Sequence, residues 1–479
     1  MQEKLKKATA YLNQHQDQTA QSNYYQTRHF CSPVGWMNDP NGFIYYQHAY
    51  HLFFQYYPYA PSWHTMYWGH AKSTNLLDWE QLPLALAPSE VYDDDENGGC
   101  FSGTAIEKDG KLCLFYTGCI TGSDGEFTQT QCLATSDDGL NFIKHDNNPL
   151  IETTYPGVKA SEFRDPKVWV NGVIYFMLVG VSVHGKGNAI LYRSLDALDW
   201  HLIGPIVDEN RDDLGTMWEC PDYFEIAGKS VLIFSPLGLG DCLTVYLIGQ
   251  LDYDTGKFSI DSQGQADYGT DFYAPQTLQD DTGTYFMIGW QNGWDWMPKW
   301  QGFGPTDADG WSGSMSLPRQ VVMNDQGTLS FLPLPALKHS YANQLVKKEV
   351  SLTSSLQTVF NQVRESFQLV LTCSVSNHDY KIEMSSPTGE KDVIYISRDA
   401  IRYDSVANKH GKVAVRMPVI SDDIHLTIIS DTLSLEIFEM VSGRVMSVNH
   451  YQVKGERTIK MCCEQASIVP TIELFEFTT

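Results

Sequence analysis

The chain has 479 residues, and 33 lysines and arginines against 58 aspartates and glutamates give it a formal net charge of −25. Nucleic-acid phosphates and anionic lipid would repel so acidic a chain, so we expect neither as a partner. A hydrophobic fraction of 42% excludes global disorder, and the length suggests more than one domain. Aromatic residues reach 13%, which favours β-structure and suits a cleft that stacks sugar rings.

The N-terminal sequence MQEKLKKATAYLNQHQ lacks the apolar run of about 7 to 15 residues that a signal peptide needs. It is typical of a short amphipathic helix, and we assign residues 1–28 to an N-terminal helical extension. No stretch is apolar over the roughly 20 residues that cross a bilayer. The ten cysteines have neither metal-ligand nor disulfide-framework spacing. These features predict a cytoplasmic protein with reduced thiols.

One apolar, aromatic-rich strand pattern recurs five times along the chain, with starts 54 to 62 residues apart. The copies are HLFFQYY from His51, KLCLFYTG from Lys111, VIYFMLVG from Val173, SVLIFSPLG from Ser230 and TYFMIGW from Thr284. Turn signals such as Asp-Gly and Asn-Gly precede most copies, so each is expected to be the second strand of a hairpin. The repeat predicts a five-bladed β-propeller. An array of β-sandwiches is the alternative, and the fifth unit is the least regular, since residues 297–313 read as a loop.

The character of the sequence changes after the Pro-rich segment LPLPAL, residues 332–337. Tryptophan disappears, and alternating strand patterns such as DVIYISRDAIRYD at residues 392–404 take over. We therefore predict an all-β chain, with a propeller over residues 29–338 followed by a C-terminal β-sandwich over residues 345–479.

The first strand of each propeller blade lines the central channel. Each repeat strand is preceded, 8 to 12 residues earlier, by one of the candidate channel residues Asp39, Ser102, Asp165, Glu219 and Tyr273. The repeat is expected to bring these residues together near the axis, and three of them carry carboxylates. Asp-Pro also opens ordinary turns, so for either aspartate alone a structural role would be favoured over a functional one. Their shared place in the repeat favours a site.

Three carboxylates in an aromatic cleft suit hydrolysis of a glycosidic bond. One acid must protonate the leaving oxygen while another attacks the sugar or stabilises its positive charge. The apolar neighbours of Glu219 in sequence would favour its protonated form, and the polar turn around Asp39 would favour the anion. Arg164 is expected to pair with another acid or with the substrate. No metal cluster, nucleotide loop or Ser-His-Asp arrangement competes with this interpretation.

Four motifs resemble the family-32 glycoside hydrolases, the invertase and fructanase family: WMNDPNG (36–42), FSGT (101–104), FRDP (163–166) and WECPD (218–222). DFYAPQT (271–277), GWQ (289–291) and WSGSMSLPR (311–319) fit the same family in the same order. The resemblance covers residues 25–340 strongly and the remainder weakly. In this C-terminal remainder, the segment that the family usually has as EIFVNDGE is EIFEMVSGR at residues 436–444. The family resemblance implies a propeller with a sandwich, a retaining reaction, and no metal or organic cofactor.

The same resemblance implies roles for individual residues. Asp39 corresponds to the nucleophile, Glu219 to the general acid/base and Asp165 to the acid that stabilises the transition state. In a retaining enzyme the carboxyl groups of Asp39 and Glu219 lie roughly 5 to 5.5 Å apart. The residues implied for the fructose subsite are Asn38, Gln55, Trp63, Phe101, Ser102, Arg164, Tyr273 and Trp290.

The predicted function is a β-fructofuranosidase that cleaves the fructosyl bond of sucrose 6-phosphate or sucrose. The segments GCFSGTA, QTQCLATSDDG and GTMWECPDYF resemble cytoplasmic bacterial enzymes that cleave the phosphorylated sugar. The alternatives are an enzyme that trims short fructo-oligosaccharides, an enzyme that transfers fructose to another sugar, and a non-catalytic sugar-binding propeller. Lys72, His64 and His70 are near the relevant loop in sequence, but each could equally be structural. Oligomeric state is open.

Overall fold

The computed structural model describes residues 1–479 with the exception of 124, 153, 208–210, 212, 295–303, 406–413, 466 and 479. Nearly all of its regular structure is β-strand, and α1 (Gln2–Thr19) is the only α-helix among these described residues. The all-β prediction is therefore confirmed. Residues 297–303 of the segment expected to be a loop lie outside the described residues.

Five sheets of four or five strands occupy the N-terminal two-thirds of the chain. Their orders are β19-β1-β2-β3-β4, β5-β6-β7-β8, β12-β11-β10-β9, β13-β14-β15-β16 and β17-β18-β20-β21. The strands of the first two sheets are β1 (Gly35–Tyr46), β2 (Ala49–Tyr57), β3 (Tyr67–Ser73), β4 (Glu80–Gln81), β19 (Trp311–Ser312), β5 (Gly99–Lys108), β6 (Lys111–Thr121), β7 (Phe127–Ser136) and β8 (Ile143–Lys144). Those of the next two are β9 (Phe163–Asn171), β10 (Ile174–Val183), β11 (Lys186–Ser194), β12 (His201–Pro205), β13 (Met217–Ile226), β14 (Lys229–Leu237), β15 (Val245–Asp252) and β16 (Lys257–Gln265). The fifth consists of β17 (Tyr273–Gln279), β18 (Tyr285–Trp290), β20 (Arg319–Met323) and β21 (Leu329–Leu332).

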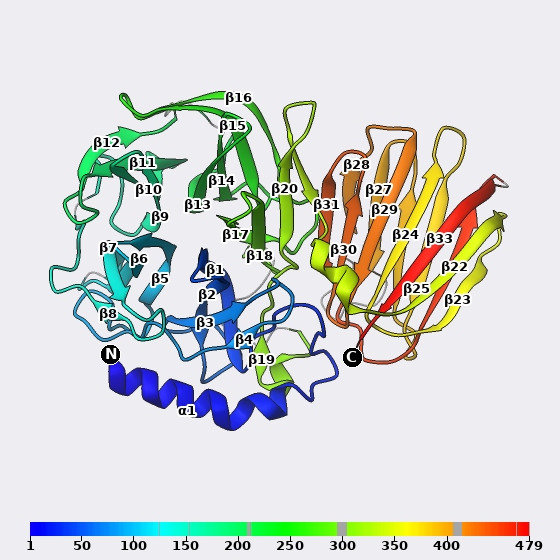
Figure 1. Cartoon of the computed structure of the whole chain (residues 1–479), viewed down its shortest axis with the longest axis horizontal. Coiled ribbons are helices and arrows are strands. Elements are labelled where there is room, and N and C mark those ends of the chain that lie inside the picture. Colours follow the sequence, from blue (N-terminus) through cyan, green and yellow to red (C-terminus); the bar gives the residue numbers. More distant parts are fainter. Residues whose placement is uncertain are drawn as a thin grey trace.

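The first strands of these five sheets form a closed ring, here called the inner ring. β1 contacts β5, β5 contacts β9, β9 contacts β13, β13 contacts β17, and β17 contacts β1 again. Figure 1 shows the five sheets arranged around this ring. The five repeats found in the sequence fall on β2, β6, β10, β14 and β18, the strand next to the inner strand in every sheet. The prediction that each repeat is the second strand of a hairpin is confirmed.

The C-terminal part consists of two six-stranded antiparallel sheets. One has the order β22-β33-β24-β29-β30-β31 and the other β23-β32-β25-β26-β27-β28. Their strands are β22 (Tyr341–Leu352), β23 (Gln357–Val363), β24 (Phe367–Ser374), β25 (Tyr380–Ser385), β26 (Lys391–Ile396), β27 (Ala400–Ser405), β28 (Ala414–Pro418), β29 (Asp423–Ser430), β30 (Ser434–Glu439), β31 (Arg444–Asn449), β32 (Arg457–Cys463) and β33 (Ser467–Phe477). Alternate residues of both sheets, such as Ile382, Ile428 and Leu474, are buried in one shared core. Figure 1 shows the two sheets beside the five small ones.

The helix α1 lies against the first of the small sheets. Its buried residues Leu5, Ala8 and Leu12 are spaced three and four apart, so they share one face, and they belong to the core cluster of that sheet. Lys4 forms an ion pair of 2.5 Å with Asp94. The predicted amphipathic helix is confirmed, and it is docked on the five-sheet part. Two η helices, η1 (Asp307–Asp309) and η2 (Pro335–Ser340), are short connections.

A buried ionic cluster joins the five-sheet part to the two larger sheets. His29 contacts Asp431 at 3.1 Å and Glu436 at 3.0 Å, and Arg319 contacts Glu436 at 3.0 Å and Asp267 at 2.7 Å. Burial alone would lower the pKa of His29, but hydrogen bonds to the two carboxylates outweigh it and raise this pKa to about 9. Glu436 opens the segment that departs from the family pattern, yet it lies at the centre of this junction.

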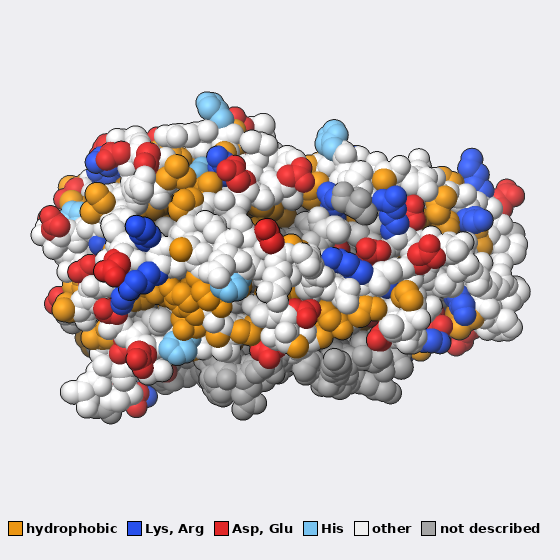
Figure 2. All heavy atoms as spheres, turned by 90° about the horizontal axis from the view of Figure 1, so that it is seen from below, with side chains coloured by type: hydrophobic (Ala, Val, Ile, Leu, Met, Phe, Trp, Pro, Cys, Tyr) orange, Lys and Arg blue, Asp and Glu red, His pale blue; other side chains and the backbone are white. Residues whose placement is uncertain are grey.

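The surface on the side of α1 carries acidic and basic side chains interspersed, as Figure 2 shows. Hydrophobic side chains gather there in the half that holds the five small sheets. Within the described part of the chain, no helix has both the length and the apolar character that crossing a membrane requires.

Candidate active site

A small pocket of about 80 Å³ opens where the inner strands begin. Strands β1, β5, β9 and β13 all contribute to it, together with loops that follow β2 and β18. Its lining among the described residues is Asn38, Asp39, Gln55, Trp63, Phe101, Ser102, Arg164, Asp165, Glu219 and Trp294. The pocket thus gathers three carboxylates from segments up to 180 residues apart, as the repeat predicted.

Every inner strand is irregular at the level of the pocket. The pairing register between the first and second strands shifts by one residue in each of the five sheets, which marks β-bulges. Asp165, Cys220 and Ala274 have positive φ angles of 65°, 47° and 51°, and each directly precedes a proline. A non-glycine residue seldom adopts such angles, and strain of this kind concentrates at functional sites.

The bulges correct the alignment made from the sequence. In β9, β13 and β17 the last residues paired before the bulge are Arg164, Glu219 and Tyr273. The sequence alignment placed Glu219 and Tyr273 level with Asp165, but they are level with Arg164, one residue earlier. Because the spacing between repeats varies by several residues, the sequence could not fix this register. The pocket therefore has two levels, one holding Arg164, Glu219 and Tyr273 and the next holding Asp165.

Asp39 is held through only one of its carboxylate oxygens. Its Oδ2 accepts a hydrogen bond of 2.8 Å from the Ser102 hydroxyl and contacts the Cys220 thiol at 3.6 Å. Its Oδ1 is buried and has no hydrogen-bond partner among the described residues. Burial, aided by the charge of Glu219, raises the pKa of Asp39 to about 6, although the bond from Ser102 opposes the rise. Hydrogen-bonding neighbours that favour the anion are present, as expected from the sequence, but desolvation outweighs their effect on the pKa.

Asp165 lies within the bulge of β9 and receives a hydrogen bond from the backbone of β13. Its Oδ2 accepts the backbone N–H of Cys220 at 2.9 Å and contacts the Cys220 thiol at 3.5 Å. The same thiol therefore lies between Asp39 and Asp165. Burial raises the pKa of Asp165 to about 7, and the nearby Arg164 guanidinium limits the rise.

Glu219 is held from both sides by the neighbouring inner strands. Arg164 donates from Nε at 3.1 Å and from Nη2 at 2.8 Å to Oε1, while the Tyr273 hydroxyl donates to Oε2. The apolar neighbours expected around Glu219 do not surround its carboxylate. Trp218 points to the opposite side of β13, where its ring stacks on Phe234 with centroids 3.8 Å apart.

Nine of the eleven predicted site residues line the pocket, and two lie behind it. Tyr273 is buried and reaches the pocket only through its bond to Glu219. Trp290 is fully buried, and its ring lies 6.4 Å from Tyr273 and 4.6 Å from Trp294. The residue that lines the pocket in its place is Trp294, which sequence reasoning missed. The GWQ motif drew attention to Trp290, and the loop after β18 carried no comparable signal.

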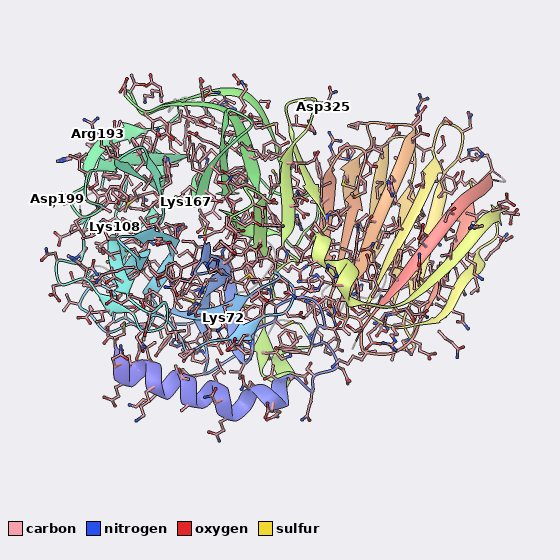
Figure 3. All side chains as sticks on the ribbon, in the orientation of Figure 1. Lys72, Lys108, Lys167, Arg193, Asp199 and Asp325 are labelled. Carbon is pink, nitrogen blue, oxygen red and sulfur yellow. The ribbon has the colours of Figure 1, made fainter. Side chains whose placement is uncertain are left out.

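The three candidates for binding a phosphate group lie in structural surroundings. His70 is fully buried, contacts His51 at 2.9 Å and stacks on Phe53. Lys72, labelled on β3 in Figure 3, pairs with Glu80 at 3.2 Å. It lies four residues along the strand from Trp68, the residue paired with Gln55, so about 13 Å separates it from the pocket level. His64 stacks on Tyr57 beside the pocket entrance loop.

A larger hollow of about 470 Å³ opens at the other end of the inner ring. It is lined by Lys167, Trp169, Tyr223 and Glu225 among others, and Figure 3 shows Lys167 toward the middle of the ring. Lys167 is neutralised by an ion pair with the buried Asp222. Glu107 and Glu225 line this hollow, but Asp39, Asp165 and Glu219 all line the smaller pocket. These three acids, and not the size of the cavity, identify the smaller pocket as the candidate active site. Among the described residues no group of histidine, cysteine, aspartate and glutamate side chains could hold a metal ion.

The sequence profile of the glycosyl hydrolases family 32 N-terminal domain matches residues 29–333. The chain belongs to glycoside hydrolase family 32. The sucrose-6-phosphate hydrolase of Bacillus subtilis is 32% identical over 449 residues, which cover 90% of both proteins. The raffinose invertase of Escherichia coli is 32% identical over 468 residues, or 94% of both.

Among solved structures, the family-32 beta-fructofuranosidase of Bombyx mori, crystallised as a variant with sucrose, is similar with a TM-score of 0.84. It is 30% identical, and the match covers 98% of this chain and 97% of that one. These relatives support the interpretation of the family-32 motifs as those of a glycoside hydrolase. The enzyme class predicted from the sequence is confirmed.

Proposed function

We propose that this family-32 enzyme is a retaining β-fructofuranosidase that hydrolyses the fructosyl bond of sucrose 6-phosphate, sucrose or both. The observation that carries the proposal is the unequal holding of two carboxylates that face one pocket. Asp39 has one oxygen fixed by Ser102 and the other without a partner among the described residues, as a nucleophile requires. Glu219 is fixed by Arg164 and Tyr273, as an acid/base requires.

In the first step, Oδ1 of Asp39 attacks C2 of the fructosyl unit while the bond from C2 to the glycosidic oxygen breaks. Glu219 gives its proton to that oxygen, and glucose or glucose 6-phosphate leaves. The Tyr273 hydroxyl can donate to the ionised Oε2 or accept from the protonated one, so Glu219 keeps a partner in both states.

In the second step, Glu219 takes a proton from water as the water oxygen attacks C2 and releases Asp39. Two displacements on opposite faces of C2 retain the configuration. The Cys220 thiol lies between Asp165 and Asp39, so the carboxylate of Asp165 is close enough to bind fructose hydroxyls and stabilise the positive charge that develops on the ring. The 5 to 5.5 Å separation of the two reacting carboxyl groups stays a prediction.

The decisive experiment compares glucose release from sucrose by the wild-type protein and by Asp39→Ala. We expect the variant to lose at least about a thousandfold in kcat while keeping its melting temperature. A folded variant with full activity would remove Asp39 from its role. A wild type that binds both sucrose and sucrose 6-phosphate but cleaves neither would support the non-catalytic sugar-binding alternative instead.

Substrate choice follows from the relatives and is tested by comparing kcat/KM on sucrose 6-phosphate, sucrose, raffinose and kestose. The sucrose-6-phosphate hydrolases among the relatives favour the phosphorylated sugar for this chain. A clear preference for kestose would identify an enzyme for short fructo-oligosaccharides. If the fructose of the product were joined to a second sugar, fructosyl transfer would be the main reaction.

We also infer that the five small sheets are the blades of a β-propeller over residues 29–338, with residues 1–28 as an extension. The closed contacts of the inner ring support this. Residues 345–479 would form the β-sandwich, and β22 begins at Tyr341, slightly before that boundary. All ten cysteines are free, which supports action in the cytoplasm.

A further inference from the structure

We propose that Thr117, Gln129 and Gln131 are positioning residues that hold Arg164 and Asp165 in their working arrangement. None of the three lines the pocket, and all belong to the second small sheet. The inference rests on the proposed function, because it assigns these residues to the proposed catalytic step. The second small sheet already lines the pocket through Phe101 and Ser102 of β5, and the inference gives its strands β6 and β7 a part in holding the acids.

The three side chains form a buried polar group on the face of β6 and β7 that meets β9. Thr117 and Gln131 are fully buried and Gln129 is 2% exposed. Thr117 and Gln131 are paired across the two strands, and Gln129 is two residues further along on the same face. Three uncharged polar side chains in such a place need hydrogen-bond partners, and β9 supplies them.

The side chains of Gln129 and Gln131 form hydrogen bonds with the backbone of β9, as a neighbouring strand would. The backbone N–H of Phe163 donates to Oε1 of Gln129 at 3.0 Å, and Nε2 of Gln131 donates to the backbone C=O of Phe163 at 2.9 Å. Both backbone groups of one residue are therefore held by two side-chain amides. Because Phe163 directly precedes Arg164 and Asp165, these two hydrogen bonds fix the backbone from which both side chains extend.

Thr117 holds the bulge itself. The backbone N–H of Asp165 donates to the Thr117 hydroxyl at 2.9 Å, and that hydroxyl donates to Oε1 of Gln131 at 2.9 Å. The positive φ of Asp165 turns its N–H away from the regular ladder to β10, so this bond replaces a lost backbone partner. Without it, a strained residue would keep its conformation with a buried donor unsatisfied.

Gln129 also reaches the catalytic acid through one intermediate. Its Oε1 accepts from Nη1 of Arg164 at 3.4 Å, while Nη1 also donates to the backbone C=O of Ser161 at 3.2 Å. These two contacts orient the guanidinium so that Nε and Nη2 face Glu219. The second sheet thus acts on Asp165 through its backbone and on Glu219 through Arg164.

The test compares Thr117→Val, which keeps the shape of the side chain but removes its hydroxyl, with Thr117→Ser, which keeps the hydroxyl. We expect Thr117→Val to lower kcat on sucrose about tenfold or more with a much smaller change in KM. Thr117→Ser should restore most of the loss. Gln81→Leu is the matched control, since it removes hydrogen bonds to the backbone C=O groups of His70 and Leu82 far from β9.

A second variant, Gln129→Glu, keeps the shape and adds a negative charge beside Arg164. The new carboxylate should compete with Glu219 for the guanidinium and raise the pKa of the site carboxyls. We expect the acid limb of the kcat/KM profile to move to higher pH, an effect that lost stability alone would not produce.

The positioning role would be overturned by Thr117→Val lowering kcat no more than Gln81→Leu, or by an unchanged pH profile in Gln129→Glu. If Thr117→Val did not fold, the profile of Gln129→Glu would decide alone. Failure of the proposed function is separate, because it would appear as a wild-type protein that releases neither glucose from sucrose nor glucose 6-phosphate from sucrose 6-phosphate.

Discussion

Arg164 on β9 donates two hydrogen bonds, of 3.1 and 2.8 Å, to a single oxygen of Glu219 on β13. The two residues are 55 positions apart in the chain but occupy the same level of adjacent inner strands. The guanidinium thereby fixes the acid that the proposed mechanism uses twice, first as proton donor and then as proton acceptor. Substitutions of Arg164 can separate the effect of its two-donor geometry on Glu219 from the effect of its positive charge.

Replacing Arg164 by lysine keeps the positive charge but removes the forked donor pair. We expect Arg164→Lys to lower kcat/KM about 10- to 100-fold, because one ammonium cannot hold Glu219 in the same orientation. Arg164→Met should in addition move the acid limb of the pH profile upward, since the guanidinium opposes the raised pKa of Asp165. Steady-state kinetics on sucrose across the acidic range measure both effects, and equal profiles for the two variants would contradict this division.

Glu219→Gln should slow cleavage most for substrates whose leaving group most needs protonation. Sucrose has a poor leaving group, so we expect its cleavage to fall by about 100-fold or more. A fructoside with a phenolic leaving group should lose far less in the bond-breaking step. Single-turnover rates on both substrates provide the measurement, with wild type as reference. Equal slowing of both would argue against the acid role of Glu219.

The buried Asp165 should cost stability at neutral pH. Its folded-state pKa, about 7, lies above the unfolded value near 3.9, so its contribution to stability is present below that lower value and is lost as pH rises through 7. Asp165→Asn stays neutral, so its stability advantage should grow between about pH 4 and pH 7 and reach about 1–4 kcal/mol above that range. Urea unfolding at both ends of the range tests this, and an advantage independent of pH would refute it.

The buried junction between the two parts of the chain should depend strongly on Arg319. Removing its charge in Arg319→Met leaves Asp267 buried without its cation and Glu436 with His29 as its remaining partner, which should cost about 3–5 kcal/mol. The exposed pair of Lys229 and Asp261 is the control, since Lys229→Met should cost less than about 1 kcal/mol. Adding Glu436→Gln to Arg319→Met should cost less than the sum of the two changes. Strict additivity would show that the two side chains are not coupled.

Much of the fold could be predicted from the sequence because its signals are local and repeated. The strand pattern at His51 and its four later copies each mark a strand whose apolar side chains are buried on both faces. Their order along the chain also predicted that Asp39, Asp165 and Glu219 would meet. The motifs then identified the family on residues that are adjacent in sequence.

The rest of the site depends on contacts between strands, which no local pattern records. The level of Glu219 depends on a bulge register, and the pKa of Asp39 depends on how deeply the closed ring buries it. Trp294 lines the pocket with its ring 4.6 Å from that of Trp290, a contact that no local sequence pattern indicates. The pairing of Arg164 with Glu219 was left open by the sequence because residues on separate strands determine it.

The two-residue strand β19 pairs in parallel with β1, matching Trp311 to Gly35 and Ser312 to Trp36. The sheet that carries Asp39 therefore stays incomplete until more than 270 further residues have been synthesised. Such late pairing of distant segments slows folding and makes it cooperative over the whole circuit. A nascent chain that ends before this strand would hold all three acids, and its inner ring could close at β17, but the sheet of Asp39 would lack one strand. We therefore expect hydrolysis to begin only after β19 has paired with β1.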